Sequence, residues 1–428
     1  MGDISDFLTP LGFALEVNVE MESITVGGVA LGFGMEVNSH LKGFFQETVL
    51  EYEMVSSTGD ILTVDAESDP DLFYAIPWSC GALGFLTALK VKIHPIKKFV
   101  RLRYEITRSP QELCDKMTRL SESSDAPTFL EATIFDKNTA VLQMGDFADS
   151  VPNESQADPR LVDYPLSKAL PSVNGINWWW KPFYYKWLET FIAKGGGEEY
   201  IPYSHYCHRF TRSIFWEIED MIPFSNHPLY RFFWGWMGAP EVSLLKLFQG
   251  PVIRQASVSA HVVQESICPV RSLSNCIENF DGWFGVYPLL VFPLRVYDRG
   301  TRSGFLTPHK RNLHGPGKKW GIWVDVGAYG APREVKEGRN WDPKVNVRGM
   351  EHWTRDEGGW QACYTDMFCT HREFREMFNH ELLDKMRARL RCEDAFPLPY
   401  TKMKPEKGIV DLAAEEAAEK AKGTFVEG

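Results

Sequence analysis

Hydrophobic and polar positions alternate in short blocks along residues 1–96, which predicts small helices and strands in turn. In chain order the pattern predicts a helix at 2–11, a strand at 13–17, a hairpin with strands at 48–55 and 61–64, a helix after Asp69, and a strand after Gly84. Gly12 fits the end of a helix, and Asp69 followed by Pro70 fits the start of one.

From residue 99 the blocks become longer. Predicted strands lie at 99–106, 127–135, 139–145, 259–265, 283–292, 321–329 and 362–366. Predicted helices begin at Pro110 and near Pro269, and a longer helix is predicted from His371 to Leu390. Strands mixed with helices in this way predict an α+β fold.

Aromatic residues are concentrated in the stretch of about residues 150–250. Seven of the 14 tryptophans of the chain lie between Asn174 and Trp236. One interpretation is a helical insertion with an aromatic core, since aromatic side chains dominate cores generally. The other is an apolar cavity, or a membrane-facing surface, for a rigid lipid, because Trp and Tyr suit the boundary between dry and wet surroundings.

Composition narrows the class of ligand. The formal net charge of −11 argues against a nucleic-acid partner, which requires a basic face. The eight cysteines are scattered and form no CxxC pair, so we expect reduced thiols. No run approaches the ~18 apolar residues of a membrane-spanning helix, so we expect no transmembrane segment in this chain.

A glycine-rich stretch, "SITVGGVALGFGMEVNSH", contains the clearest candidate for a binding site. It is either a tight loop or a backbone nest, formed around Thr25, Gly27 and Gly28, that a flat or phosphorylated ligand approaches closely. A second glycine pair, Gly81 and Gly84, precedes the next strand. The spacing fits neither the nicotinamide GxGxxG fingerprint nor the P-loop, so a different dinucleotide fold is indicated.

Several motifs carry a resemblance to a known family: "TVGGVALGFGMEVNSH", "DLFYAIPWSCGALGFLTALKVKIHP", "EYIPYSHYCHRFTRSIFWE", "VDVGAYGAPR" and "CEDAFP". Over residues 1 to about 400 the chain resembles the Δ24-sterol reductases of the vanillyl-alcohol-oxidase/PCMH superfamily. The resemblance implies that 1–96 is the second half of a PCMH-type FAD-binding domain. It also implies an α+β substrate (cap) domain at 97–400, with the aromatic-rich insertion at 150–250. The Ala/Glu-rich composition of 401–428 predicts a frayed helix or a solvated tail.

The resemblance further implies reduction of the C24=C25 double bond of a sterol side chain, with FAD as cofactor and NADPH as electron donor. Family members sit at the cytosolic face of the endoplasmic reticulum membrane, so peripheral membrane contact is expected. Their membrane helix and first flavin subdomain precede the point that matches Met1, so weak FAD binding and weak activity are expected of this chain. The residues that match FAD contacts are Thr25, Val26, Gly27, Gly28, Val29, Ala30, Leu31, Gly32, Phe33, Gly34, Met35, Glu36, Val37, Cys80, Gly81, Gly84 and Phe85.

Reduction of an isolated alkene requires a proton donor, because no carbonyl polarises the double bond. The candidates are Tyr364, Asp366 and His371 in one stretch, and His208, Arg209 and Glu217 in another. Tyr364 is preferred, because we expect it on a short strand of the cap domain, where its hydroxyl could donate a proton from an otherwise apolar wall. Each also has an ordinary structural interpretation: Tyr364 as core, Glu217 on a solvated face, Arg209 in an ion pair.

"HYCHR" at 205–209 has the spacing of two metal ligands, but no second pair lies nearby, so no metal site is predicted. Two other functions fit the pattern: another FAD-linked oxidoreductase, and a lipid-binding protein without catalysis. Flavin colour in the purified protein would separate them.

Overall fold

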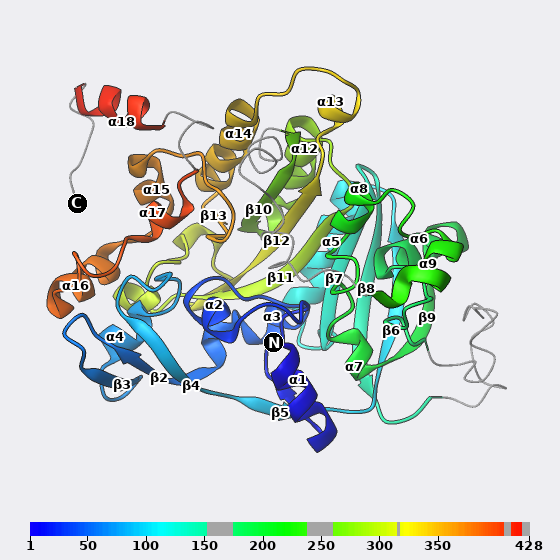
Figure 1. The fold of residues 1–428 in the computed structure, drawn as a ribbon, viewed down its shortest axis with the longest axis horizontal. Helices are drawn as coiled ribbons and strands as arrows, with labels where there is room; N and C mark the ends of the chain where they lie inside the picture. Colours follow the sequence, from blue (N-terminus) through cyan, green and yellow to red (C-terminus); the bar gives the residue numbers. More distant parts are fainter. Residues whose placement is uncertain (152–173, 238–259, 315–316, 406–411, 422–428) are drawn as a thin grey trace.

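The computed structural model describes residues 1–151, 174–237, 260–314, 317–405 and 412–421. Its largest element is an eight-stranded sheet in the order β13-β10-β12-β11-β7-β8-β6-β9, with every neighbouring pair antiparallel (Figure 1). The strands are β6 Phe99–Thr107, β7 Phe129–Asp136, β8 Thr139–Ala148, β9 Gly197–Pro202, β10 Val262–Pro269, β11 Leu289–Tyr297, β12 Trp320–Gly330 and β13 Trp360–Gln361. This arrangement agrees with the predicted α+β class.

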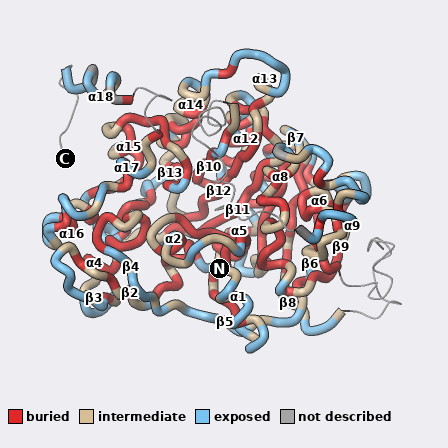
Figure 2. The backbone as a smooth tube through the Cα atoms, viewed as in Figure 1, coloured by how far each residue is buried: buried red, intermediate tan, exposed pale blue. Residues whose placement is uncertain are grey.

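The two faces of the sheet pack against different partners. Helices α5 (Pro110–Glu122), α12 (Leu273–Trp283) and α14 (Pro343–Asp356) cover one face with an apolar core. The other, here called the inner face, meets the N-terminal part of the chain and the aromatic-rich stretch around residues 183–216. Figure 2 shows that the strands between these layers are buried. Side chains on alternate positions of each strand therefore point to chemically different surroundings.

The N-terminal part is built from short elements, largely as predicted. They are α1 Gly2–Leu8, η1 Thr9–Leu11, β1 Phe13–Leu15, α2 Val26–Leu31, α3 Ser39–Lys42, η2 Phe45–Thr48, β2 Val49–Val55, β3 Ile61–Asp65, α4 Pro70–Ala75, β4 Phe85–Val91 and β5 Ile93–Pro95. Gly12 ends the first helical stretch at a φ of 82°. The Asp69 side chain caps α4 by accepting the Leu72 N–H at 3.2 Å.

Two predictions in the C-terminal third are wrong. Residues 362–366 are not a strand, because β13 ends at Gln361 and the N–H groups of Tyr364 and Thr365 turn back to Ala362 O. The helix predicted from His371 to Leu390 is two helices, α15 His371–Met377 and α16 Glu381–Leu390. The break lies at Phe378, whose ring stacks 4.5 Å from that of Phe305.

Other boundaries also differ from prediction. Helix α12 continues to Trp283, so β11 begins at Leu289 rather than at 283. Part of the aromatic-rich stretch is a strand, since β9 pairs with β6 and forms one edge of the large sheet. Residues 152–173 and 238–259 of that stretch lie outside the described residues.

The C-terminal segment also differs from the solvated tail that we expected. Helix α18 (Leu412–Ala421) buries Leu412, and its Glu415 forms ion pairs with Lys344 and Arg348 of α14. The expected helical character is present, but the helix is attached to the body of the protein.

Gly84 gives a test of the packing around β4. A Cβ at this position would lie 2.1 Å from Met54 Cε and 2.9 Å from Val55 O, and the backbone oxygen cannot move aside easily. We expect Gly84→Ala to lower the free energy of unfolding by about 1–3 kcal/mol, measured by chemical denaturation.

Gly282→Ala is the matched control. A Cβ at Gly282, inside α12, meets no atom within 4 Å, so this change is expected to stabilise the protein by up to about 1 kcal/mol. Equal effects of the two substitutions would contradict the packing described here.

Candidate functional site

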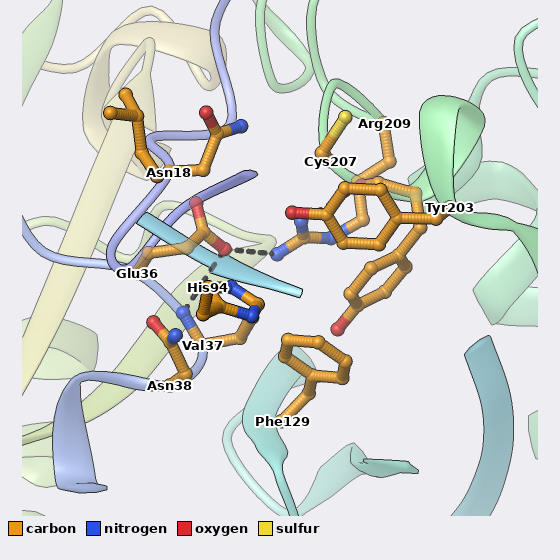
Figure 3. A pocket seen from close by; sticks show the side chains of 11 residues that line it. Asn18, Glu36, Val37, Asn38, His94, Phe129, Tyr203, Cys207 and Arg209 are labelled. Atoms are coloured by element: carbon orange, nitrogen blue, oxygen red, sulfur yellow. Dashed lines mark hydrogen bonds and ion pairs between the residues drawn. The ribbon is translucent and has the colours of Figure 1, made fainter. Parts of the chain in front are cut away.

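A small buried cavity lies between the N-terminal part, strand β5 and the chain around α7 (Tyr203–Tyr206), at the inner face of the sheet (Figure 3). Its volume is about 20 Å³, which is enough for about one water molecule. Asn18 Nδ2, Glu36 Oε2, Asn38 Oδ1 and Tyr206 Oη belong to its lining residues and have no hydrogen-bond partner among the described residues. The cavity is therefore surrounded by both donors and acceptors.

The guanidinium of Arg209 is the central charge of this site. Its side chain is 0% exposed, and Nη2 lies 2.9 Å from both Glu36 Oε1 and Glu131 Oε2. Nε donates to Glu131 Oε1 at 3.1 Å, so the contact with Glu131 is bidentate. Figure 3 shows the Glu36 side of this arrangement. Because Glu36 belongs to the stretch 25–37 and Glu131 to β7, Arg209 attaches the predicted FAD-contact segment to the sheet.

A third carboxyl group, that of Glu20, interacts with Glu36. Burial, reinforced by the Glu36 carboxylate, raises the pKa of Glu20 well above its usual value. Burial also raises the pKa of Glu131, although Arg209 opposes this effect. Burial therefore favours the protonated form of Glu20 more than in an exposed carboxyl group.

The two stretches predicted to contact FAD lie side by side. The Cys80 N–H donates to Leu31 O at 2.8 Å, which joins the stretch 80–85 to the stretch 25–37. Gln46 Nε2 donates to Val29 O at 2.5 Å and to Gly32 O at 2.6 Å. The expected loop is partly helical, because residues 26–31 form α2.

Most of the glycines in these stretches are explained by close packing inside the protein itself. A Cβ would approach within 3 Å of a neighbouring atom at Gly28, Gly32, Gly34 and Gly84. At Gly28 that atom is Thr25 Oγ1, which already accepts the Gly28 N–H at 3.2 Å. Gly27 and Gly81 are different, since their nearest atoms would lie at 3.9 Å and 3.5 Å. Only these two positions leave the backbone open to a flat ligand, and to that extent the stretches fit FAD.

The predicted FAD contacts divide by exposure. Thr25–Gly28, Leu31, Gly32, Cys80, Gly81 and Phe85 are exposed or half-buried, whereas Val29, Ala30, Phe33–Val37 and Gly84 are buried. The first group could touch a ligand directly, and the second could act only by supporting the first. The assignment of these residues to FAD stays a prediction.

Two of the predicted proton donors contact the predicted FAD segment: Arg209 is buried against Glu36, and Tyr364 lies against Phe33. Tyr364 sits in the turn after β13, its side chain is 51% exposed, and its ring meets Phe33 edge-on at 6.5 Å. Tyr364 is thus neither on a strand nor in the core. Asp366, two residues later, is half-buried.

The remaining candidates lie elsewhere. His208 is buried next to Arg209, and burial, aided by the N-terminal ammonium and Arg209, lowers its pKa to about 4. His208 is therefore neutral at pH 7 and has no acidic proton of an imidazolium to give. Glu217 forms an ion pair with His261 at 2.9 Å, and His371 begins α15, where burial lowers its pKa.

The aromatic-rich stretch separates into two groups. The first, on and around α6 (Tyr184–Lys194), is buried core: Tyr184, Tyr185, Trp187, Phe191 and Trp216. Several of its members have buried polar partners; Trp187 Nε1, for example, donates to Glu199 Oε1 at 2.9 Å. The second group, on α9 (Pro228–Trp234) and η4 (Gly235–Met237), is exposed. The first group agrees with the interpretation as an aromatic core, whereas a lipid- or membrane-facing role for the second group stays a prediction.

A larger cavity, of about 300 Å³, lies beside the β2–β3 hairpin and α4. Its cation Arg299 is paired with Glu47 and lies over the Tyr74 ring at 5.1 Å. No residue that we predicted for catalysis or FAD binding lines it.

Several acids of the inner face were missed by sequence reasoning. Glu131, Glu265 and Asp325 lie inside strands that consist mainly of apolar residues. An acid inside such a run was the available signal, because burying a charge is costly unless it is paired or protonated. Within the described ranges, no group of three or more His, Cys, Asp or Glu side chains is arranged to hold a metal ion.

Comparisons with known proteins give a consistent result, although no family model matches the chain. The chain is 36% identical to the Delta(24)-sterol reductase of Mus musculus over 405 residues, which is 94% of this chain and 72% of that protein. It is 31% identical to the Delta(24)-sterol reductase of Arabidopsis thaliana over 415 residues, again 94% and 72% of the two chains.

A shorter match concerns a differently named protein. The chain is 35% identical over 78 residues to an uncharacterized FAD-linked oxidoreductase of Arthroderma benhamiae. The match covers 18% of this chain and 16% of that protein.

Arg209 allows a test of the buried charge group. In Arg209→Met, Glu36 and Glu131 would stay buried without their cation, so we expect a loss of about 3–5 kcal/mol in the free energy of unfolding. Without the cation that opposes it, burial raises the folded-state pKa of Glu131 further above the unfolded value, so stability should fall as pH rises. Chemical denaturation at pH 5.5 and 8 measures both effects.

Arg101→Met is the control, because Arg101 pairs with Glu198 at 2.6 Å with 47% of its side chain exposed. A change below about 1 kcal/mol is expected there. A similarly small loss for Arg209→Met would show that the buried group does not need its cation.

Proposed function

The chain belongs to the Delta(24)-sterol reductase family, and from this we propose that it reduces the C24=C25 double bond of a sterol side chain, with FAD as cofactor and NADPH as electron donor. The observation that carries the proposal is identity of 30–36% over 94% of the chain to reductases of animals and plants. The shorter match to an FAD-linked oxidoreductase supports the flavin.

We propose that the open backbone at Gly27 and Gly81, together with Thr25 and Cys80, holds part of FAD. When bound, FAD supplies the hydride that NADPH provides. The chain's own task is then to bind the sterol, exclude water and donate one proton to the alkene. Tyr364 is the proposed donor, because its half-exposed side chain lies against Phe33 of the predicted FAD segment.

Membrane contact is proposed for the exposed aromatic group, which we call the aromatic face: Phe224, Leu229, Phe232, Phe233, Trp234 and Trp236. Each of these side chains is at least 52% exposed. Arg231 fixes α9 to the body, since Nη2 donates to Trp179 O at 2.6 Å and the guanidinium lies 4.3 Å from the Phe183 ring. A firmly attached aromatic surface suits the lipid interface from which a sterol is drawn.

None of the helices in the described ranges combines the length and apolar character needed to cross a bilayer. A location at the endoplasmic reticulum membrane is proposed from the family. In this proposal the aromatic face touches the bilayer surface.

The function is tested by incubating the protein with FAD, NADPH and a sterol that carries the C24=C25 bond, and following the saturated product by mass spectrometry. We expect NADPH-dependent reduction. Gly27→Val should lower flavin content and turnover together while leaving the melting temperature unchanged, because its Cβ has room.

Tyr364→Phe is the companion variant, expected to lower kcat about a hundredfold with flavin content unchanged. Gly282→Val is the control for Gly27→Val, because Gly282 also lies in a helix, has no atom within 4 Å of its Cβ position, and belongs to α12, away from the predicted FAD segment. Product formation without NADPH or FAD dependence would contradict the proposed chemistry.

The aromatic face is tested by flotation with sterol-containing liposomes. Replacing both Phe233 and Trp234 by Ser should weaken binding about a hundredfold, since each buried aromatic side chain contributes roughly 1.5 kcal/mol or more. Phe7→Ser with Leu11→Ser removes two equally exposed apolar side chains from α1 and η1. If this control weakens binding as much, the aromatic face is not the membrane contact.

A further inference from the structure

Three ionisable side chains form a row on the inner face between strands β10 and β12. In the register of this pair, Glu265 lies opposite Gly327, Ile267 opposite Asp325 and Val263 opposite Tyr329. Glu265 is therefore the diagonal neighbour of both Asp325 and Tyr329 on the same face of the sheet. Long side chains reach each other across this diagonal.

The hydrogen bonds of this row are incomplete. The Tyr329 hydroxyl donates to Glu265 Oε1. Glu265 Oε2 and Asp325 Oδ1 are buried and have no hydrogen-bond donor among the described residues. Glu265 and Asp325 are 3% and 4% exposed, so solvent does not satisfy them. Two adjacent carboxyl groups can satisfy each other only when one of them carries a proton.

No cation neutralises the pair. Among the described residues, no Lys, Arg or His forms an ion pair with Glu265 or Asp325, in contrast to Glu36 and Glu131. The other titratable groups near the row are Glu20 beyond Tyr329 and, at the end of β12, Asp220 together with the Glu217–His261 pair. Cys268 of β10 points to the opposite, helix-covered face. Acidic neighbours outnumber the single histidine, so they favour the protonated state of the pair.

The direction of the pKa shifts agrees with this geometry. Burial, and next the Glu265 carboxylate, raises the pKa of Asp325 well above its usual value. Burial raises the pKa of Glu265 to about 7, although the hydrogen bond from Tyr329 and the neighbouring Asp325 carboxyl oppose this. Burial therefore favours the protonated form of both groups, and because they are coupled the proton belongs to the pair rather than to either residue.

We propose that Asp325 and Glu265 share a transferable proton on the inner face of the sheet, where the Tyr329 hydroxyl donates a hydrogen bond to Glu265, and that this pair supplies the proton of the proposed reduction. These residues position and store a proton; Tyr364 keeps the proposed role of direct donor.

The inference rests on the proposed function, because each reduction of the double bond consumes one proton that must be supplied to the site. Each turnover breaks one alkene π bond and forms two C–H bonds, one from the hydride of NADPH and one from a proton, and releases NADP⁺. One proton is therefore consumed per turnover, and the buried pair regains it from solvent afterwards. A neutral pair inside the protein keeps that proton available where water is excluded.

The shared proton is tested by infrared spectroscopy of the full chain, titrated between pH 5 and 9. A neutral carboxylic C=O band should lose intensity with a midpoint near pH 7, the value to which the pKa of Glu265 is raised, because the pair then keeps only its shared proton. The band that changes near pH 7 should be absent in Asp325→Asn and in Glu265→Gln. Persistence of this band in both variants would overturn the proposal.

Glu351→Gln is the matched control. Glu351 is a buried carboxyl of α14 whose pKa burial raises to about 8, and it accepts the Phe368 N–H at 2.8 Å. Removing it should delete a different band and leave the transition near pH 7 in place. Loss of the pH 7 transition in this control would assign that band to Glu351 and contradict the proposal.

The supply of the shared proton to the reaction is tested by the pH dependence of kcat. Tyr329→Phe keeps the ring and the infrared band but should lower kcat about tenfold and shift its alkaline limb by about one pH unit. Unchanged pH profiles in Tyr329→Phe and Asp325→Asn would overturn this supply. If the wild-type protein reduces no sterol, the proposed function fails, while the infrared band still decides whether the pair shares a proton.

Discussion

A buried guanidinium, that of Arg209, neutralises carboxylates from two parts of the chain that lie far apart in sequence, Glu36 and Glu131. The N-terminal part contains only short elements and small sheets, whereas Glu131 stands on a central strand of the large one. An ion pair at this depth is costly to form and more costly to break, because any member left alone is a buried, unpaired charge. The position of the stretch 25–37 on the sheet therefore depends on Arg209.

The same constraint explains why acids occur on the inner face at all. Its strands are apolar, and each isolated acid in them must be paired or protonated. The structure uses both solutions: Glu131 pairs with Arg209, whereas Glu265 and Asp325 have only each other and Tyr329. Glu199, at the other edge of the sheet, is surrounded by donors from Tyr104, Asn174 and Trp187. Polar chemistry is thus concentrated on one face, and the opposite face is packed by helices.

The parts of the fold that could be predicted from the sequence are those set by local periodicity and caps. The hairpin at 48–64, the Asp69 cap and the strand at 321–329 appear where expected, because alternation and capping act over few residues. The strand at 362–366 and the unbroken helix from His371 failed for tertiary reasons. In the first, the chain turns back on Ala362 O, and in the second, Phe378 leaves the helix to stack on Phe305.

The candidate site was also predictable only in part, because its contacts join residues that lie far apart in the sequence. Glycine-rich stretches showed where the backbone is crowded, but they did not distinguish crowding by a ligand from crowding by Thr25, Val29 or Met54. Arg209 was recognised as an ion-pair member, yet its partners come from residues 36 and 131, and no local pattern connects them.

The charge of the Arg209 group also determines the protonation of its surroundings. Two carboxylates, Glu36 and Glu131, and one guanidinium leave a net charge of about −1 in a dry environment. Burial, reinforced by the repulsion of the Glu36 carboxylate, raises the pKa of the next acid, Glu20, well above its usual value. Beyond it, burial and the carboxyls of Glu265 and Asp325 hold the Tyr329 hydroxyl in its neutral form. The negative charge of the Arg209 group and the raised pKa of Glu20 therefore lie next to the stretch 25–37, where the proposed chemistry needs a proton.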